Sequence, residues 1–311
     1  MAHTSPAAVA VLEPASTVET EPGPPMRRRS RRRRALAFRV FAYSMLTLLS
    51  LFIMLPVGWM LASALKPDLE PVFTLPPQWF PTEFWHWENF QRALTSSAVP
   101  MLRYIVNTCV IVVGNILGTL ISCSIAAYAF ARLRFRGSKV LFSILIITML
   151  IPWQALMIPQ FLLFLKLGWY GTYYPLIVPS FGGTAFFIFL IRQYMRTIPK
   201  DLDDAARVDG LSTWQIFWRI ILPLSTPALT VCAVFVFIWT WSNLLGPLIY
   251  LNDDSQFTVA IGLANLAQRA GNAQWNVLMA ANLISIIPPI VVYFVLQRRL
   301  IGGIASVGLK G

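Results

Sequence analysis

Six long apolar runs, free of charged residues and of histidine, dominate this 311-residue sequence. Each is close to or above the roughly 20 residues that an α-helix needs to cross the ~30 Å hydrocarbon core of a membrane. They cover residues 40–64, 104–131, 140–165, 172–191, 223–249 and 276–297. With 57% hydrophobic and 12% charged residues, the chain is too apolar for a soluble fold. Because only helices and closed barrels satisfy their backbone in lipid, we expect an all-α integral membrane protein with six transmembrane helices.

The lysines and arginines between these runs indicate how the chain is oriented. Cytoplasmic loops of membrane proteins carry an excess of Lys and Arg. If the N-terminus is cytoplasmic, 20 of the 25 basic residues fall on that side. The other five are Lys66, Arg92, Arg103, Lys166 and Arg269. The sequence therefore predicts a multi-pass protein with both termini in the cytoplasm, and the net charge of +12 needs no nucleic-acid partner.

Residues 1–35 differ from the rest of the chain in composition. The first 25 residues are rich in Pro, Ala, Ser and Thr, which cannot bury a core, and we expect them to be disordered. The run Arg27–Arg34 directly precedes the first apolar run. Such a cluster can bind nucleic acid, but beside a transmembrane helix it is more simply an anchor for anionic lipid headgroups. We therefore expect a disordered cytoplasmic tail with a basic anchor over residues 1–35 and a membrane domain over residues 36–311.

A soluble helical hairpin is predicted over residues 199–222, between two apolar runs. Pro199 lies near the expected helix start, and the acidic residues that follow suit the positive end of the helix dipole. They are Asp201, Asp203 and Asp204. Gly210 then ends this helix as a C-cap, and Ser212 with Gln215 forms a capping box that starts a second helix at once.

Two features distinguish this hairpin from an amphipathic connector that rests in the lipid headgroups. Ala205 and Ala206 have small side chains that let a partner come close. Asp209-Gly210-Leu211 defines a tight turn. A connector needs neither feature, so we expect the hairpin to contact a partner.

The spacing within the hairpin resembles the EAA-x3-G-x9-I-x-LP loop of binding-protein-dependent ABC importer permeases. The chain has Asp204-Ala205-Ala206, Gly210 and Ile220-x-Leu222-Pro223 at the matching distances, with Asp204 in place of the usual Glu. Softer motifs within residues 36–311 resemble the carbohydrate-uptake branch, specifically its maltose-type second permease subunit. They are Ser63-x-x-Lys66-Pro67, Asn89-Phe90, Asn107-Thr108, Ile198-Pro199, Trp241-Ser242-Asn243, Gln297-Arg298-Arg299 and Leu309-Lys310-Gly311.

This resemblance implies a type I ABC importer permease fold in a bacterial cytoplasmic (inner) membrane. In such permeases the loop is the coupling helix, which docks on an ATP-binding subunit so that closure of the ATPase dimer rotates the spans. The residues implied in this contact are Asp204, Ala205, Ala206, Asp209, Gly210 and Leu211. The implied partners are a second homologous permease subunit, two ATP-binding subunits and an extracytoplasmic solute-binding protein or lipoprotein. The chain itself is expected to be non-catalytic, with no metal or cofactor, and ATP is bound by its partners.

Polar and aromatic residues inside the apolar runs are candidates for the substrate path. A sugar or related polyol needs aromatic faces for its CH groups and amides for its hydroxyls. The candidates are Asn243, Trp241, Trp239, Asn107, Gln154 and Asn282. Each has an alternative role, because polar side chains also bridge helices and Trp also lies at the lipid interface. Glycerol 3-phosphate or another polar solute is the alternative substrate.

Two long external loops, residues 67–102 and 246–275, are long enough to meet an extracytoplasmic binding protein. The second resembles the loop of the family that probes the sugar cleft of the binding protein. Its candidates for docking are chosen by position alone, and a solvated connector is an equal alternative. They are Asp253, Asp254, Gln268, Arg269 and Asn272.

Two other classes of protein remain as alternatives. An ion-coupled secondary carrier usually has an ionisable residue inside a span, and none of the six runs has one. A membrane-embedded enzyme needs a cluster of catalytic groups, but the sequence has no phosphate-binding loop and no paired nucleophile and base. ATP hydrolysis by a partner is therefore the simplest source of energy.

Overall fold

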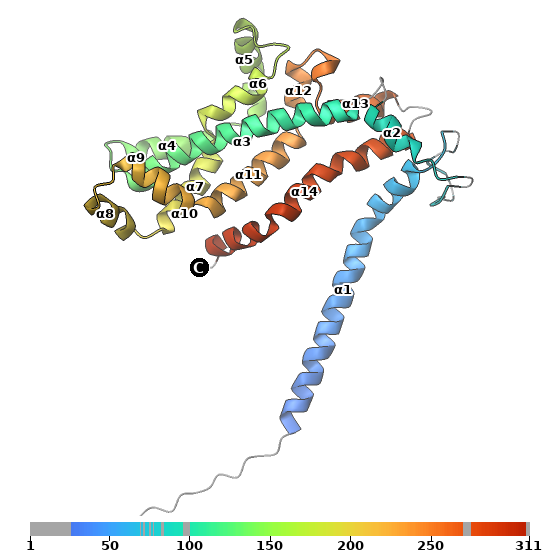
Figure 1. The fold of residues 1–311 in the computed structure, drawn as a ribbon, viewed down its shortest axis with the longest axis horizontal. Helices are drawn as coiled ribbons and strands as arrows, with labels where there is room; N and C mark the ends of the chain where they lie inside the picture. Colours follow the sequence, from blue (N-terminus) through green and yellow to red (C-terminus); the bar gives the residue numbers. More distant parts are fainter. Residues whose placement is uncertain are drawn as a thin grey trace, which may run out of the picture. The chain divides into compact units, whose positions relative to one another are not determined.

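The computed structural model describes residues 26–68, 70, 72–74, 76, 78–81, 84–95, 100–269 and 275–308. Every regular element within these ranges is a helix (Figure 1), which confirms the expected all-α class. The chain divides into two units, Met1–Leu55 and Pro56–Gly311. The predicted disorder of residues 1–25 lies outside the described residues.

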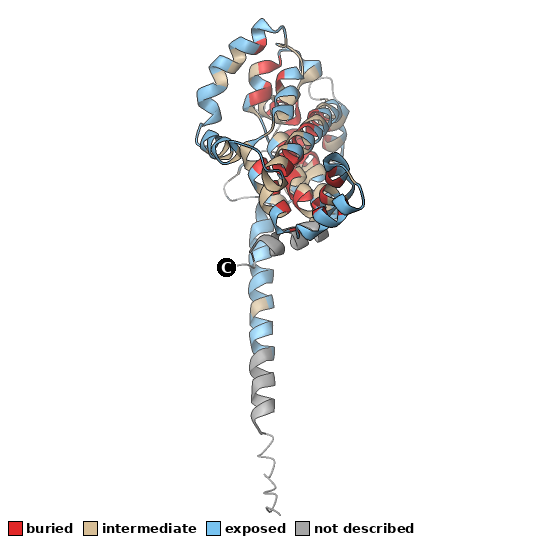
Figure 2. Cartoon of the chain, turned by 90° about the vertical axis from the view of Figure 1, so that its left-hand side faces the viewer, coloured by how far each residue is buried: buried red, intermediate tan, exposed pale blue. Residues whose placement is uncertain are grey.

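The first unit contains the N-terminal part of α1 (Met26–Ala64). The helix begins at Met26 and includes the arginine run, whereas the sequence predicted a disordered tail up to residue 35. Arginine has a good helix propensity, and extending an existing helix requires no new nucleus. From Leu36 to Leu55 nearly every residue is exposed (Figure 2). A helix with apolar side chains on all sides is expected to contact lipid or another membrane protein.

The second unit is built around α3 (Met101–Arg132), the long helix that runs through the middle of Figure 1. Its ends and sides are covered by four helices that contact it or contact one another. They are α2 (Glu88–Thr95), α7 (Ala185–Thr197), α11 (Thr226–Trp241) and α14 (Trp275–Gly308). Figure 2 shows the buried residues gathered in the helical bundle of this unit. The expected spans 104–131 and 276–297 lie within α3 and α14.

Close packing against α3 depends on Gly118. A Cβ at this position would collide with the Ser180 Oγ and would lie 2.8 Å from the Phe181 ring. Both residues belong to η1 (Val178–Gly182), a 3₁₀ segment between α6 (Tyr174–Ile177) and α7. In membranes, small residues at a helix interface let the backbones approach, which explains the glycine here.

The expected span 140–165 is not one straight helix. α4 (Ser138–Thr148) and α5 (Trp153–Lys166) cover it, but their axes differ by 95° across a short break. Pro152 ends this break. A proline disfavours helical backbone in the residue before it, so the helix cannot run straight through.

The expected span 223–249 is also divided. The helical segment Thr213–Leu224 meets α11 at an angle of 73°, and a second break separates α11 from α12 (Leu245–Tyr250). Pro223 and Pro227 lie on either side of the 73° bend. Proline is favoured in the first turn of a helix over its interior, so a straight helix through both positions is disfavoured. Among the described residues, four helices are long and apolar enough to cross a membrane, or up to six if each bent pair is one span. One of the four is Tyr174–Thr197, which extends the expected span 172–191.

Candidate functional site

The first helix of the predicted hairpin is α8 (Asp201–Val208), with three acidic residues in its first turn. The residue after its C-cap is Gly210, whose φ of +81° lies in the left-handed region that glycine adopts without strain. The Gly210 N–H donates to the Arg207 carbonyl and the Leu211 N–H donates to the Ala206 carbonyl, each at 3.0 Å. These two bonds form a Schellman motif, so the C-cap expected from the sequence is confirmed.

The second helix of the hairpin starts at Ser212. Its hydroxyl accepts from the Gln215 N–H at 3.3 Å, and the Gln215 Oε1 accepts from the Ser212 N–H at 2.8 Å, which confirms the capping box. The helix then changes its winding. A short α-helical turn is followed by a π-helical turn, a feature that is frequent at functional sites and that the sequence did not indicate. The three segments are α9 (Thr213–Ile216), η2 (Phe217–Ile221) and α10 (Leu222–Leu224).

The two faces of α8 have different surroundings. Asp203 and Ala206 are each 4% exposed and face the rest of the second unit. Most of the remaining docking candidates point outward: Asp204, Ala205, Asp209 and Gly210 are exposed, and Leu211 is half-buried. Val208, 88% exposed, belongs to the same outer face. Val208 is not part of the sequence motif, although its place four residues after Asp204 indicates a shared face.

A cavity of about 140 Å³ lies beside α3, α6, α11 and α12. Its lining has no charged side chain and consists of Thr108, Ile111, Asn115, Leu176, Trp239, Thr240, Asn243, Pro247 and Thr258. Trp239 and Asn243, both exposed, offer an indole ring and an amide. The buried Thr258 Oγ1 has no hydrogen-bond partner among the described residues. The structure therefore brings two of the six substrate-path candidates together with the Asn115 amide and with the hydroxyls of Thr108, Thr240 and Thr258.

Two further candidates donate to backbone carbonyls and do not line this cavity. Trp241 is buried, stacks on Phe237 with ring centroids 5.5 Å apart, and donates from Nε1 to the Ser285 carbonyl at 3.2 Å. Asn282 donates from Nδ2 to the Leu278 carbonyl one turn earlier in α14, at 2.8 Å. Sequence position alone cannot distinguish such contacts from a place on the substrate path.

The last two substrate-path candidates also lie elsewhere. Asn107 donates from Nδ2 to the carbonyls of Ser255 and Phe257, at 2.8 and 3.0 Å. It thereby fastens the loop that contains η3, a 3₁₀ turn over Asp254–Gln256, to α3. Gln154 is exposed on α5 and does not line the cavity.

The two acidic docking candidates of the outer loop are tied into its structure. The Asp253 carboxylate accepts from the Ser255 N–H at 2.8 Å and starts η3. Hydrogen bonds from the Ser255 side chain and backbone lower the pKa of Asp253. Asp254 accepts from the Tyr104 hydroxyl at 2.8 Å. These contacts shape the loop, so the presence of the two carboxylates has a structural reason.

The remaining docking candidates lie at the end of α13 (Val259–Arg269) and beyond it. Gln268 is exposed. The side chain of Arg269 and the whole of Asn272 lie outside the described residues.

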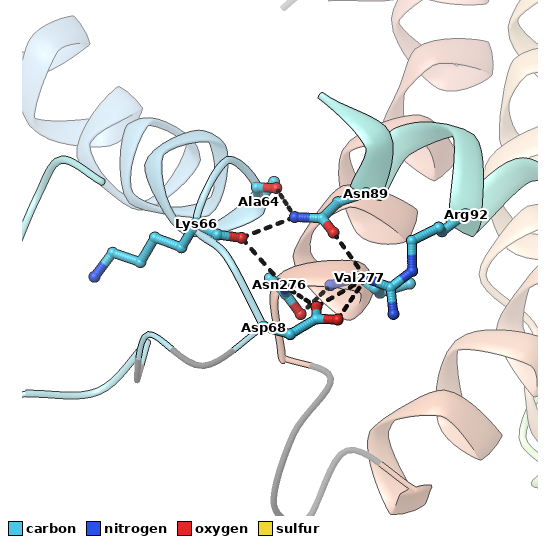
Figure 3. Close-up of polar contacts among 7 residues, drawn as sticks. All are labelled: Ala64, Lys66, Asp68, Asn89, Arg92, Asn276 and Val277. Atoms are coloured by element: carbon cyan, nitrogen blue, oxygen red, sulfur yellow. Dashed lines mark hydrogen bonds and ion pairs between the residues drawn. The ribbon is translucent and has the colours of Figure 1, made fainter. Parts of the chain in front are cut away.

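A polar network fastens the C-terminal end of α1 within the second unit (Figure 3). Asn89, from α2, donates from Nδ2 to the carbonyls of Ala64 and Lys66, both at 2.9 Å. Asn276, from α14, donates to the same Lys66 carbonyl at 3.1 Å. These amides satisfy carbonyls that the helix end leaves without intrahelical partners. The network gives a physical role to the Lys66 and Asn89 motifs noted in the sequence.

Asp68 extends this network to a charged residue. Both of its carboxylate oxygens lie 2.8 Å from the Arg92 Nη1, and Oδ1 accepts from Asn276 at 2.7 Å. Partial burial raises the pKa of Asp68, but the hydrogen bonds from Arg92 and Asn276 outweigh it and lower the pKa below its ordinary value. The carboxylate is therefore held in its charged form.

Comparisons with known proteins agree with this arrangement. The sequence profile of the family described as "binding-protein-dependent transport system inner membrane component" matches residues 114–305. The arabinooligosaccharides transport system permease protein AraQ of Halalkalibacterium halodurans is 36% identical over 193 residues, 62% of this chain and 68% of that protein. The osmoprotective compounds uptake permease protein GgtD of Synechocystis sp. is 35% identical over 266 residues, 82% of this chain and 87% of that protein.

A solved structure shares the fold. It is the crystal structure of a bacterial ABC transporter involved in the import of the acidic polysaccharide alginate. One of its chains matches with a TM-score of 0.73 at 24% identity, over 86% of this chain and 97% of that chain. This confirms the ABC importer permease fold expected from the hairpin. The family profile matches more than half of the length of this chain, so the chain belongs to the family of binding-protein-dependent transport system inner membrane components.

Proposed function

We propose that this chain is one permease subunit of an ATP-driven ABC importer and forms half of a pore for a neutral sugar or related polyol. A second homologous permease subunit forms the other half. Two ATP-binding subunits dock from the cytoplasm, and an extracytoplasmic binding protein or lipoprotein delivers the solute. The observation that carries the proposal is the outer face of α8. This face is exposed, and the caps at the end of α8 and at the start of α9 hold the hairpin in a defined shape.

The composition of that outer face suits protein docking. It combines the apolar Val208, the small Ala205 and the acidic Asp204, all exposed. Asp204 pairs with Arg207 at 2.8 Å, but both side chains are solvent-exposed, so this ion pair holds them only weakly. A valine that is 88% exposed on a capped helix is well placed to be buried by a partner.

Orientation and energy supply support the same assignment. The excess of Lys and Arg in alternate loops favours cytoplasmic termini, which places α8 on the side where ATP is available. The six apolar runs contain no ionisable side chain of the kind that ion-coupled carriers use. Energy therefore enters through a partner.

A neutral solute is favoured by the cavity beside α3. An indole ring, two amides and several hydroxyls line it, and no cation is present to balance an anionic solute. A charge moved out of water without a partner is strongly disfavoured, which argues against glycerol 3-phosphate at this site. The named relatives include a permease for arabinooligosaccharides, which are neutral polyhydroxylated solutes.

The docking assignment can be tested with one variant and one matched control. Val208→Glu places a charge on the outer face of α8, at the last residue of the helix. Phe84→Glu places the same charge on an extracytoplasmic loop, at an apolar residue that is 74% exposed. We expect Val208→Glu to lose the ATP-binding subunits on purification and to reduce uptake by about tenfold or more. Phe84→Glu should retain them. Full retention by Val208→Glu would refute the docking assignment.

The solute assignment needs the complete importer in membrane vesicles. Uptake of labelled arabinooligosaccharides and of labelled glycerol 3-phosphate is measured with ATP inside the vesicles. We expect ATP-dependent uptake of the neutral solute only. Uptake of glycerol 3-phosphate alone would overturn the neutral-solute assignment and leave the docking assignment intact.

A further inference from the structure

Two neighbouring acidic residues of α8 differ in burial and in their ion-pair partners. Asp204 is exposed and lies on the outer face, with Arg207 as its partner at 2.8 Å. Asp203 points inward, where its Oδ2 lies 3.4 Å from the Arg132 Nη1. The side chains of this second pair are only 6% and 1% exposed. Adjacent carboxylates of the same first turn therefore have different surroundings.

Arg132 is the last residue of α3, and its guanidinium contacts the chain at two points. Its Nη2 donates to the Ile198 carbonyl at 2.8 Å, at the C-terminal end of α7. Its Nη1 faces Asp203 in the first turn of α8. Between these points lies the short connection through Pro199 and Lys200. The planar guanidinium thus spans the turn between α7 and α8 and fixes the direction of α8 relative to both α3 and α7.

Tyr128, one turn earlier in α3, holds the other arm of the hairpin. Its hydroxyl donates to the Thr213 carbonyl at 3.2 Å, at the start of α9. Its ring packs against Phe217, with centroids 5.0 Å apart. Residues four apart share one face of a helix, so Tyr128 and Arg132 together attach both arms of the hairpin to the end of α3.

We propose that the buried Arg132–Asp203 pair is the joint that transmits movement of α8 to α3, and that Asp203 positions the docking helix while Asp204 belongs to its docking face. This inference rests on the proposed function of α8 as the docking helix. Without the joint, α8 is linked to the spans through the turn at Pro199, through the packing of Ala206 in the core and through the contacts of α9. Removing one charge of a buried pair leaves the other uncompensated, so the joint is sensitive to neutralisation of either residue.

The structure also offers room to exchange the two charges. A cavity of about 460 Å³ lies against Arg132 and Asp203 and is also lined by Leu133, Arg134, Lys200, Asp204 and Arg207. It can accommodate an arginine on α8 in place of Asp203. An exchange places each charge at the less favourable end of its helix dipole, so recovery is expected to be partial.

The test uses the complete importer, purified with its partner subunits and reconstituted in proteoliposomes. Three variants are compared with the unmodified complex: Asp203→Asn, Asp203→Glu and the double exchange Arg132→Asp/Asp203→Arg. Each is assayed for retained ATP-binding subunits, for ATP hydrolysis and for solute taken up per ATP. Asp204→Asn tests the docking face, and Asp201→Asn, which neutralises another exposed carboxylate of the same first turn, is the matched control.

We expect Asp203→Asn to retain the ATP-binding subunits and to lose about tenfold in uptake per ATP. Asp203→Glu keeps the charge and should retain most of the coupling, and the exchange should recover several-fold over the single neutral variant. Asp204→Asn should instead weaken retention of the ATP-binding subunits, and Asp201→Asn should change neither their retention nor the uptake per ATP.

Two outcomes overturn the joint. One is normal uptake per ATP in Asp203→Asn. The other is an equal loss of uptake per ATP in Asp203→Asn and Asp203→Glu, which shows that the site requires the shape of aspartate rather than its charge. This second outcome can be read even if the double exchange variant does not fold. Failure of the proposed function looks different, because Val208→Glu would then retain the ATP-binding subunits regardless of what Asp203 does.

Discussion

Replacing Asn89 with leucine removes two hydrogen bonds from the end of α1, and the two carbonyls that lose them are not equivalent. Asn89 is 2% exposed and donates at 2.9 Å to the carbonyls of Ala64 and Lys66. The Lys66 carbonyl keeps a second donor, Asn276, at 3.1 Å. The Ala64 carbonyl has no other donor among the described residues. The substitution therefore leaves one buried carbonyl without a partner.

These contacts set the expected magnitude. Losing a hydrogen bond to a carbonyl that keeps another donor lowers the free energy of unfolding by about 1 kcal/mol. Leaving a buried carbonyl without any donor lowers it by about 1–3 kcal/mol. Asn89→Leu should therefore lower the free energy of unfolding by about 2–4 kcal/mol. For a domain of this size the corresponding fall in melting temperature is about 5–15 °C. The measurement is thermal unfolding of the purified protein in detergent.

A double-mutant cycle makes the prediction specific. Asn276→Leu alone leaves the Lys66 carbonyl paired with Asn89, whereas the double variant leaves it without either amide. Because both amides donate to one carbonyl within a single hydrogen-bond network, the combined loss of stability should depart from the sum of the two single losses by about 1 kcal/mol. Thr95→Val, which removes an exposed hydrogen bond on the same helix α2, is the control and should change stability by about 0.5 kcal/mol or less. Additive single effects would refute the shared-carbonyl reasoning.

Four further predictions concern single residues. Gly118→Val should destabilise the protein by about 1–3 kcal/mol or more, because its side chain collides with Ser180, and an unchanged melting temperature would contradict the packing described. Gly210→Pro, which cannot adopt a positive φ, should abolish uptake while membrane insertion persists, and normal transport would exclude the hairpin as the coupling element. The pKa of Asp68 is lowered in the folded state, so its stabilisation is complete above its ordinary pKa of 3.8 and is lost as the pH falls through the lower folded value. Unfolding midpoints measured in acid should therefore decline more steeply for the unmodified protein than for Asp68→Asn. Trp241→Phe loses a hydrogen bond to a carbonyl and should lower stability by about 1 kcal/mol without changing solute selectivity in uptake assays.

Local sequence signals predicted the hairpin in detail. Gly210 adopts the positive φ that only glycine tolerates well, and Ser212 and Gln215 form the capping box that their spacing indicated. Both features depend on residues within four positions of each other. Caps and turns that depend only on such near neighbours can be predicted from a sequence without knowledge of the rest of the fold.

The bends in the apolar runs were not predicted. Apolar content and length identify a segment that enters a membrane, but they do not indicate whether it crosses straight. The 95° break before α5 follows from backbone preferences at Pro152, and the 73° break before α11 falls between Pro223 and Pro227. Prolines inside α1 and α14 are accommodated without such breaks, so the residue type alone does not determine the outcome.

Length, apolarity and the distribution of charges determined that this chain is a helical membrane protein, because transfer of helices into lipid depends on composition over about 20 residues. The spacing of the hairpin motif determined the family. Only the tertiary structure separated Trp239 and Asn243, which line a cavity, from Trp241, which holds helices together. Only it placed Asp203 against Arg132, 71 positions away in the sequence, while Asp204 faces outward. Contacts between distant residues arise from the packing of whole helices, and no local pattern in the sequence encodes them.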